Sequence, residues 1–156
     1  MLTGKEILKQ IEEGNITFEP KPEAGSIGPN SIDCHLGRYL LTPKKGLIVK
    51  LNGKVKESSF IKIDLANYPE GFTMQPLTLY LGSTAERVGS DLYVPEMHNR
   101  SSIARKGCAP IIGKAGLGDL GFKNDWTLEF ICLLPTVVKE GDKVAQFTFE
   151  PVQVRS

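Results

Sequence analysis

The chain has 156 residues, of which 40% are hydrophobic and 24% are charged, and it contains 16 Gly and 10 Pro. This length fits one ordinary domain, and the high Gly and Pro content favours many turns and short strands over a helical bundle. Nineteen basic and eighteen acidic residues give a net charge of +1, which excludes the broad basic surface of a general nucleic-acid binder, so an anionic ligand must be bound by local groups.

The first segment, residues 3–14, is predicted to form the one long helix of the chain. Thr3 and Glu6 match the T-x-x-E capping box, and apolar residues recur on one face of the segment. Gly14 lies where a left-handed residue commonly ends a helix. We therefore expect a helix that begins just after Thr3 and ends just before Gly14.

After residue 15, helical periodicity gives way to short apolar or alternating runs that turn residues separate. Asn52-Gly53 lies between two such runs and predicts a hairpin. About ten strands at this spacing predict a mainly β domain, a sandwich or barrel with helical additions, that spans residues 1–156. The runs are residues 16–20, 30–36, 38–41, 46–51, 60–65, 71–75, 77–84, 92–98, 109–112, 125–134 and 143–154.

The sequence argues against several other sites. The G-x-G-x-x-G pattern at residues 116–121 is followed by a turn and a strand, whereas a dinucleotide site needs this loop to open a helix. His35 and His98 lack the H-x-E and P-C-x-x-C context of zinc deaminases, so we expect no zinc.

Cellular location also follows from what the sequence lacks. No apolar run reaches the roughly 18 residues of a membrane span, and residues 1–15 lack a signal-peptide core. Three widely spaced cysteines without a C-x-x-C pattern are typical of reduced thiols. We expect a cytoplasmic protein (in the host cytoplasm if it is viral) without a membrane partner.

Residues 99–107 form a candidate phosphate site. A predicted strand runs into Ser101 and Ser102, which can cap a short helical turn, and Arg100, Arg105 and Lys106 flank them. Hydroxyls, exposed amides and cations are suitable ligands for a phosphate. The alternative interpretation is a capped surface turn with solvated charges.

Two carboxylates stand in contexts that suit catalysis. Asp119 lies among glycines in the loop 115–122, which suggests backbone held close to a ligand, although a plain turn explains it equally well. Glu129 lies in the run 126–134, where alternation places Trp126, Leu128 and Phe130 on the opposite face. A carboxylate buried there would have a raised pKa and suit proton transfer, whereas the alternative is a solvated outward side chain.

The combination of these segments resembles the dCTP deaminase branch of the dUTPase-like superfamily. The resemblance rests on Arg-Ser-Ser-Ile-Ala-Arg at 100–105, Ala-Gly-x-x-Asp-x-Gly-Phe at 115–122 and Trp-Thr-Leu-Glu-Phe at 126–130. The opening residues 1–20, Pro-x-Ser-x-Asp-x-x-Leu-Gly at 29–37 and the Gln-containing run 142–147 are similar to further segments of that family.

The resemblance implies a distorted β-barrel (β-clip) with an N-terminal helix and short helical turns. It also implies a homotrimer with active sites shared between subunits, which binds dCTP or dUTP with Mg²⁺ on the phosphates. The residues that it implies in substrate binding are Arg100, Ser101 and Ser102 at the phosphates, Ala115 and Phe122 around the base and sugar, and Gln146 at the phosphates or pocket wall.

Three residues take catalytic roles by the same resemblance. Glu129 would shuttle protons while water attacks C4 of cytosine and ammonia leaves. Arg105 would orient the substrate and the catalytic groups. Asp119 stands where dUTPases keep the carboxylate that activates water for attack on the phosphate chain.

These roles leave three functions open. Arg105 and Glu129 favour deamination of dCTP to dUTP, which supplies dTTP synthesis, and we expect this hydrolase activity first. Asp119 favours a dUTP diphosphatase, or a bifunctional enzyme that converts dCTP to dUMP. The family's C-terminal tail, which closes over the nucleotide, has no counterpart after Pro151 in this sequence, and this favours a non-catalytic nucleotide-binding paralogue.

Overall fold

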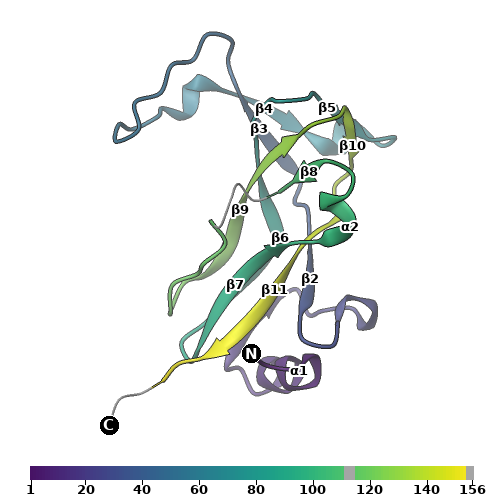
Figure 1. Cartoon of the computed structure of the whole chain (residues 1–156), viewed down its shortest axis with the longest axis vertical. Helices are drawn as coiled ribbons and strands as arrows, with labels where there is room; N and C mark the ends of the chain where they lie inside the picture. The colour runs from purple at the N-terminus through teal and green to yellow at the C-terminus, as the bar shows by residue number, and fades with distance from the viewer. Residues whose placement is uncertain (111–114, 154–156) are drawn as a thin grey trace.

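The computed structural model describes residues 1–110 and 115–153, which form antiparallel sheets with one long N-terminal helix (Figure 1). The helices are α1 (Gly4–Glu12) and α2 (Ser101–Ala104), with short 3₁₀ turns at Ala24–Ser26, Glu57–Ser59 and Leu65–Asn67. The strands are β1 (Ile16–Glu19), β2 (Ile32–His35), β3 (Tyr39–Pro43), β4 (Phe60–Asp64), β5 (Phe72–Met74), β6 (Tyr80–Ser90), β7 (Tyr93–Asn99), β8 (Cys108–Ala109), β9 (Lys123–Cys132), β10 (Thr136–Val138) and β11 (Lys143–Pro151).

Helix α1 has the boundaries that its capping residues predict. The backbone N–H of Glu6 donates to Thr3 Oγ1 at 3.3 Å, and Gly14 follows the helix with a φ of +79°. The buried face of the helix carries Ile7, which is fully inaccessible to solvent. The predicted helix is therefore confirmed.

Two main sheets enclose the core. The larger has the strand order β4-β3-β6-β9-β8, with β1 added along β6, and the smaller has the order β2-β11-β7. A two-stranded ladder joins β10 to β5. Within residues 1–110 and 115–153, the strands named above pair antiparallel. The expected mainly β fold with an N-terminal helix and short helical turns is confirmed, and the open sheets make any barrel a distorted one.

The two main sheets meet through aromatic side chains. Trp126 of β9 packs edge-to-face on Phe147 of β11, with ring centroids 4.9 Å apart. The indole N–H of Trp126 donates to the carbonyl oxygen of Val88 at 3.0 Å, so the polar atom of this buried ring is satisfied. This contact ties the strand that carries Glu129 to the strand that carries Gln146.

The predicted hairpin at Asn52-Gly53 does not form strands. The N–H of Gly53 donates to the carbonyl of Lys50 at 2.8 Å, so a turn is present, but residues 47–56 are otherwise irregular. Ile48 and Leu51 are 90% and 98% exposed, so neither run has a sheet or core to pack against. A hairpin of two strands is marginally stable in water without such packing.

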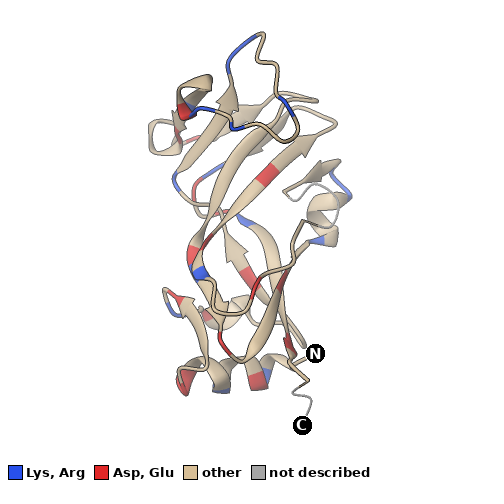
Figure 2. Cartoon of the chain, turned by 90° about the vertical axis from the view of Figure 1, so that its left-hand side faces the viewer, with Lys and Arg blue, Asp and Glu red and all other residues tan. Residues whose placement is uncertain are grey.

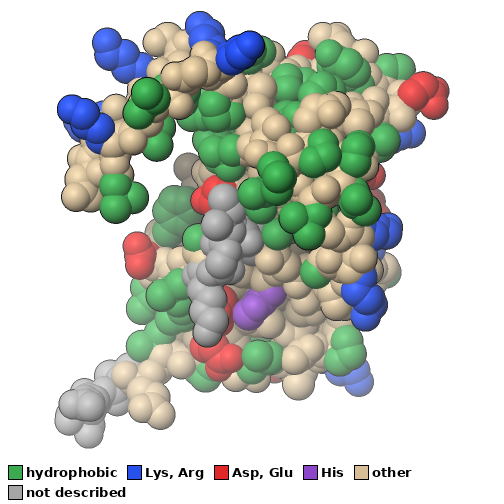
Figure 3. Space-filling model, turned by 45° about the horizontal axis from the view of Figure 1, so that its top comes forward, with side chains coloured by type: hydrophobic (Ala, Val, Ile, Leu, Met, Phe, Trp, Pro, Cys, Tyr) green, Lys and Arg blue, Asp and Glu red, His purple; other side chains and the backbone are tan. Residues whose placement is uncertain are grey.

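Residues 44–56 instead form an arm that extends from the top of the molecule and carries lysines and exposed apolar side chains (Figures 1 and 3). Figure 2 shows this concentration of basic residues on the arm from the side. The N-terminus and the end of β11 lie together at the opposite end of the molecule, where the N–H of Leu2 donates to the carbonyl of Phe149 at 2.9 Å. Across the described part of the chain, every helix is too short or too polar to cross a membrane.

Candidate active site

A cavity of about 330 Å³ opens beside α2, at the end of β7. Its lining combines polar and charged side chains with apolar ones. The lining residues are Arg100, Ser102, Ile103, Lys106, Cys108, Phe130, Thr136, Val137, Val138, Asp142, Lys143 and Val144. Three cationic side chains around a small cavity are local groups of the kind that a chain with a net charge of +1 would need to bind an anion.

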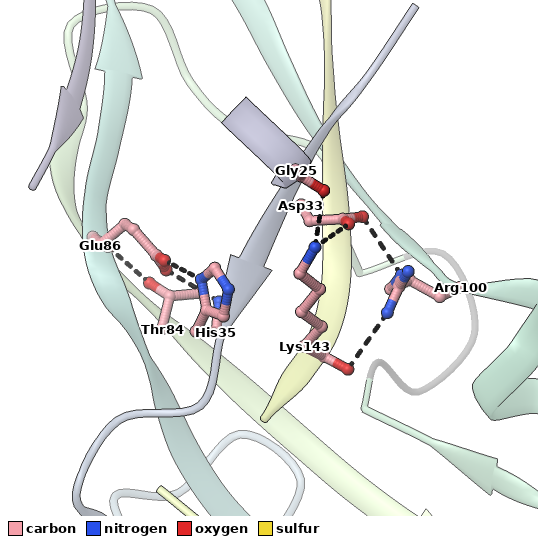
Figure 4. Close-up of polar contacts among 7 residues, drawn as sticks. All are labelled: Gly25, Asp33, His35, Thr84, Glu86, Arg100 and Lys143. Carbon is pink, nitrogen blue, oxygen red and sulfur yellow. Dashed lines mark hydrogen bonds and ion pairs between the residues drawn. The ribbon is translucent and has the colours of Figure 1, made fainter. Parts of the chain in front are cut away.

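Arg100 is held in place by contacts with neighbouring strands (Figure 4). Its Nε lies 3.2 Å from Oδ1 of Asp33, and its Nη1 lies 3.5 Å from the carbonyl oxygen of Lys143. The Nζ of Lys143 lies 3.3 Å from the other oxygen of Asp33 and donates to the carbonyl of Gly25 at 2.7 Å. Arg100 therefore enters the cavity from an anchored position.

The two serines occupy different positions from those that the sequence predicts. Ser101 and Ser102 are the first residues of α2, and Arg100 is the N-cap residue, with no side chain accepting at the cap. The N–H groups of Ile103 and Ala104 both donate to the carbonyl of Arg100 at 3.0 Å. The predicted short helical turn is confirmed, but the prediction that the serine side chains cap it is wrong. Ser102 lines the cavity, and both serines are exposed.

Arg105 and Lys106 follow α2 and differ in where they lie. Arg105 is the C-cap residue and is exposed, and it is absent from the cavity lining, whereas Lys106 contributes to that lining. The N–H of Arg105 donates to the carbonyl of Ser101 at 3.0 Å. Within this chain, the backbone of Arg105 is bonded to α2, and its exposed side chain does not contribute to the cavity lining.

Cys108 is the one thiol in the cavity lining. Burial, together with a hydrogen bond to Cys132 on the adjacent strand, raises the pKa of Cys108 to about 12. A thiol is nucleophilic only as its thiolate, so this cysteine stays neutral and unreactive near pH 7. Its contribution to the cavity is an apolar wall.

Glu129 lies on β9 next to Phe130 but on the other face of the strand. Phe130 is buried and lines the cavity, whereas Glu129 is half-buried and shares its face with exposed Thr127 and Ile131. The N–H of Glu129 donates to the carbonyl of Pro110 at 2.9 Å, so the segment after α2 runs beside it. The predicted alternation is confirmed, and it separates the carboxylate of Glu129 from the cavity within one chain.

The loop 115–122 runs back along β7, away from α2. Two backbone hydrogen bonds join the loop to β7. The N–H of Met97 donates to the carbonyl of Gly116 at 2.7 Å, and the N–H of Gly118 donates to the carbonyl of Pro95 at 2.9 Å. Asp119 therefore lies beyond Pro95, and five residues of extended strand, roughly 17 Å, separate that level of β7 from Arg100. Within one chain, Asp119 and the cavity are not brought together.

The described glycines of this loop have packing roles. A Cβ on Gly116 would lie 1.9 Å from the carbonyl oxygen of Met97, and one on Gly118 would lie 2.3 Å from the ring of Trp126. The close approach that these glycines permit is therefore to the chain's own strand and indole. Gly113, at the start of the same Gly-rich segment, lies outside the described residues.

Asp119 and Phe122 are joined in a turn. The N–H of Phe122 donates to the carbonyl of Asp119 at 3.2 Å, and Gly121 has a φ of +84°, which suits the third position of a turn. The Phe122 ring is 44% exposed and packs edge-to-face on Trp126 at 5.8 Å, and Ala115 is also exposed. Both side chains are accessible to a ligand that approaches from outside the chain.

Gln146 lies on the polar face of the smaller sheet. It is opposite Asp33 on β2 and His98 on β7, and it accepts from Ser31 Oγ at 3.4 Å. The next polar pair on this face joins His98 Nε2 to Thr148 Oγ1 at 2.8 Å. Gln146 thus belongs to a row of half-buried polar groups that leads toward Arg100.

Three polar residues that are not among the predicted site residues have defined partners in the structure. Asp33 and Lys143 anchor Arg100, and Glu86, which is 4% exposed, pairs with His35 (Figure 4). The carboxylate of Glu86 contacts His35 Nδ1 at 2.5 Å and accepts from the His35 N–H at 2.9 Å. The sequence signals for Asp33 are its place in the Pro-x-Ser-x-Asp-x-x-Leu-Gly segment at 29–37 and its position between the apolar residues Ile32 and Cys34 of a strand.

The described residues contain no group of three or more His, Cys, Asp or Glu side chains placed to hold a metal ion. Asp142 is the one carboxylate in the cavity lining, and it stands with three cations. Such a donor set does not form a protein cage for a divalent ion, but it leaves room for an ion that the phosphates of a ligand would carry.

Comparison with known proteins gives consistent matches along the chain. A family model described as dCTP deaminase-like matches residues 1–152. The "dCTP deaminase, dUMP-forming" of Clostridium acetobutylicum is 37% identical over 153 residues, which are 97% of this chain and 83% of that protein. The protein of the same name from Leptospira biflexa is 37% identical over 154 residues, which are 98% of this chain and 83% of that protein.

A solved structure also matches the fold. The 2'-deoxycytidine 5'-triphosphate deaminase from Agrobacterium tumefaciens superposes with a TM-score of 0.75 over 97% of this chain, at 17% sequence identity. The chain spans about half, 47%, of the length of that solved chain. At this identity the likeness shows a shared fold.

Proposed function

The chain belongs to the dCTP deaminase-like family and is a hydrolase of deoxypyrimidine nucleotides, and we propose that it converts dCTP to dUMP. The observation that carries this proposal is the presence of both Glu129 and Asp119 in a chain whose relatives are named dUMP-forming. One carboxylate suits each of two successive hydrolytic steps.

The sequence alone favours dUTP as the product, and the relatives favour dUMP instead. Eight curated relatives, at 31–37% identity over at least 97% of this chain, carry the name "dCTP deaminase, dUMP-forming". The bifunctional alternative is therefore better supported than a deaminase that stops at dUTP. The latter remains the second candidate, because Asp119 lies in an ordinary turn position that needs no catalytic role.

In the first step, Glu129 would transfer the protons that deamination requires. Water adds to C4 of the cytosine, ammonia departs, and dCTP becomes dUTP. Glu129 would take a proton from the attacking water and return it to the leaving amino group, which is the work of a general acid and base. Its half-buried position on β9, beside the carbonyl of Pro110, leaves part of the side chain accessible to a ligand. Arg105 would orient the substrate and Glu129.

In the second step, Asp119 would orient a water molecule for attack at the α-phosphorus of dUTP. The bond between the α- and β-phosphates breaks, and dUMP and pyrophosphate form. Asp119 is exposed at the end of the loop 115–122, beside exposed Phe122. We propose that Ala115 and Phe122 flank the base and the deoxyribose next to these two carboxylates.

The triphosphate would bind at the cavity beside α2. Arg100, Ser102 and Lys106 line it, and Ser101 precedes them on the exposed surface of the helix. Gln146 lies on the neighbouring strand in the polar row that leads to Arg100. Mg²⁺ would be held mainly by phosphate oxygens, and it would neutralise part of the phosphate charge.

The separation of these groups within one chain supports a site shared between subunits. Glu129 lies on the face of β9 opposite the cavity, and Asp119 lies roughly 17 Å along β7 from Arg100. A nucleotide that contacts all of them needs the cavity of one chain and the carboxylates of another. We propose a homotrimer that forms three such sites.

The direct test is incubation of the purified protein with dCTP, and separately with dUTP, in the presence of Mg²⁺. We expect ammonia, dUMP and pyrophosphate from dCTP, and dUMP and pyrophosphate from dUTP. Accumulation of dUTP without dUMP would support the second candidate. No product from either nucleotide would support a non-catalytic paralogue.

A further inference from the structure

Asp33 joins the two cations that lie at one edge of the cavity (Figure 4). Its Oδ1 lies 3.2 Å from Arg100 Nε, and its Oδ2 lies 3.3 Å from Lys143 Nζ. Asp33 lies in β2, Arg100 directly follows β7 as the N-cap residue of α2, and Lys143 is the first residue of β11. One carboxylate thus lies between two positive charges that come from distant parts of the chain.

The two cations face the cavity, and the carboxylate stands behind them. Arg100 and Lys143 belong to the cavity lining, whereas Asp33 does not. The Asp33 side chain is 16% exposed, compared with 27% for Arg100 and 35% for Lys143. The two cations are therefore more exposed than the carboxylate, so an anion that enters the cavity would contact them and not Asp33.

The remaining contacts fix the direction of both side chains. The described contacts of Arg100 engage Nε and Nη1 and do not engage Nη2. Lys143 donates one hydrogen bond to Gly25, and its ammonium group can donate three in total. Each cation is therefore anchored on one side and keeps donor capacity for a second partner.

We propose that Lys143 is a phosphate-binding residue and that Asp33 is a positioning residue that aims Arg100 and Lys143 together at the polyphosphate of the nucleotide. This inference rests on the function proposed above. Arg100 offers a planar fork and Lys143 a compact point charge, which suits neighbouring phosphate groups of one chain. Asp33 also offsets the repulsion between the two cations when no ligand is bound.

The proposal predicts a binding effect that depends on the phosphates. In Lys143→Ala, we expect the KM for dCTP to rise about ten- to hundredfold, the worth of one charge-assisted hydrogen bond, with kcat changed far less. Asp33→Asn should have a similar effect, because the amide keeps the shape and removes the charge. Lys143→Arg, which retains the cation, should recover most of the affinity.

Inorganic tripolyphosphate serves as the probe for the phosphate site itself. Its dissociation constant, measured by calorimetry, should rise with the KM of each variant, whereas inhibition by the nucleoside deoxycytidine should stay unchanged. A loss of both would indicate a merely structural role and overturn the proposal. Asp33→Asn removes a partly buried charge and can prevent folding. If it does, the tripolyphosphate affinity of Lys143→Ala decides whether the proposal holds.

Two control variants match the charge changes. Asp64→Asn removes a carboxylate that pairs with Arg38 at 2.9 and 2.8 Å outside the cavity, and Lys5→Ala removes an exposed lysine from α1. Both should keep the wild-type KM. If the wild type turns over dCTP and Lys143→Ala keeps its KM and its tripolyphosphate affinity, the inference is wrong. If the wild type has no turnover, the proposed function fails, and tripolyphosphate binding still tests the cation pair.

Discussion

Glu129 and Phe130 are consecutive residues of β9 whose side chains lie on opposite faces of the strand. Phe130 is 1% exposed and forms part of the cavity beside α2, and Glu129 is half-buried on the outer face. The period-two alternation of a strand therefore separates the proposed proton shuttle from the proposed phosphate site. We therefore expect a substrate that uses both to contact them on two different chains.

Mixing two inactive variants tests this separation. We expect Glu129→Gln and Arg100→Ala each to lose most activity alone, and a mixture of the two, unfolded and refolded together, to regain part of it. In the proposed homotrimer, some interfaces of a mixed assembly would combine an intact Glu129 with an intact Arg100. Ammonia release from dCTP measures the recovery, and separately refolded variants that are then combined serve as the control. Absence of any recovery would mean that both residues act within one chain.

Substitution of Glu129 tests the proton shuttle. Glu129→Gln keeps the size and hydrogen-bonding capacity of the side chain but cannot take up a proton. We expect ammonia release from dCTP to fall by about 10²–10⁴-fold, the usual worth of general acid and base catalysis, while dCTP still binds and added dUTP is still cleaved. Calorimetry measures the binding, and product analysis measures the two reactions. Deamination at the wild-type rate would show that Glu129 is not the proton shuttle.

Substitution of Asp119 should affect the second step, in which dUTP is hydrolysed to dUMP and pyrophosphate. Asp119→Asn should stop pyrophosphate release while deamination continues, so that dUTP accumulates from dCTP. The turn that contains Asp119 depends on its backbone carbonyl, which the substitution leaves in place. Asp125→Asn, an exposed carboxylate of β9, provides the control. Unchanged dUMP formation would reduce Asp119 to a turn residue.

Local sequence signals predict the parts of this fold that local forces decide. The capping box at Thr3 and Glu6, the left-handed Gly14 and the alternation around Glu129 each depend on neighbours in sequence. The arm at residues 44–56 shows the limit: a turn forms there, but it is closed by the N–H of Gly53 on the carbonyl of Lys50 and is not centred on Asn52-Gly53. The predicted strands need a packing surface that the fold does not supply.

The candidate site is harder to predict because its contacts join distant segments. The sequence indicates Arg100 through its motif, but the ion pairs that Asp33 forms with Arg100 and with Lys143 span 67 and 110 residues of sequence. Likewise, the glycines at 116 and 118 suggest a ligand when considered alone. Only the position of Trp126 and β7 reveals that these glycines pack against the chain itself.

The thiol of Cys108 predicts a pH dependence of stability. Its pKa is raised to about 12 in the folded chain, whereas an unfolded cysteine ionises near its ordinary pKa of about 8.5. Between these values the unfolded chain binds fewer protons, so the free energy of unfolding decreases as the pH rises. Between pH 8.5 and 10.5, the wild type should lose stability more steeply than Cys108→Ala. Urea unfolding at several pH values measures both slopes, and parallel slopes would contradict the prediction.

Gly118 is required by the packing of the only tryptophan. A Cβ at this position would lie 2.3 Å from Trp126 Cη2 and 2.8 Å from Pro95 Cγ. The indole cannot yield easily, because it donates to Val88 and packs between Phe122 and Phe147. We expect Gly118→Ala to lower the free energy of unfolding by about 1–3 kcal/mol, the typical cost of overpacking, and to shift the fluorescence of Trp126. Gly25→Ala, where a Cβ would meet no atom within 4 Å, should change the stability by less than about 0.5 kcal/mol. Equal stability of the two variants in urea would mean that the loop 115–122 can shift away from β9.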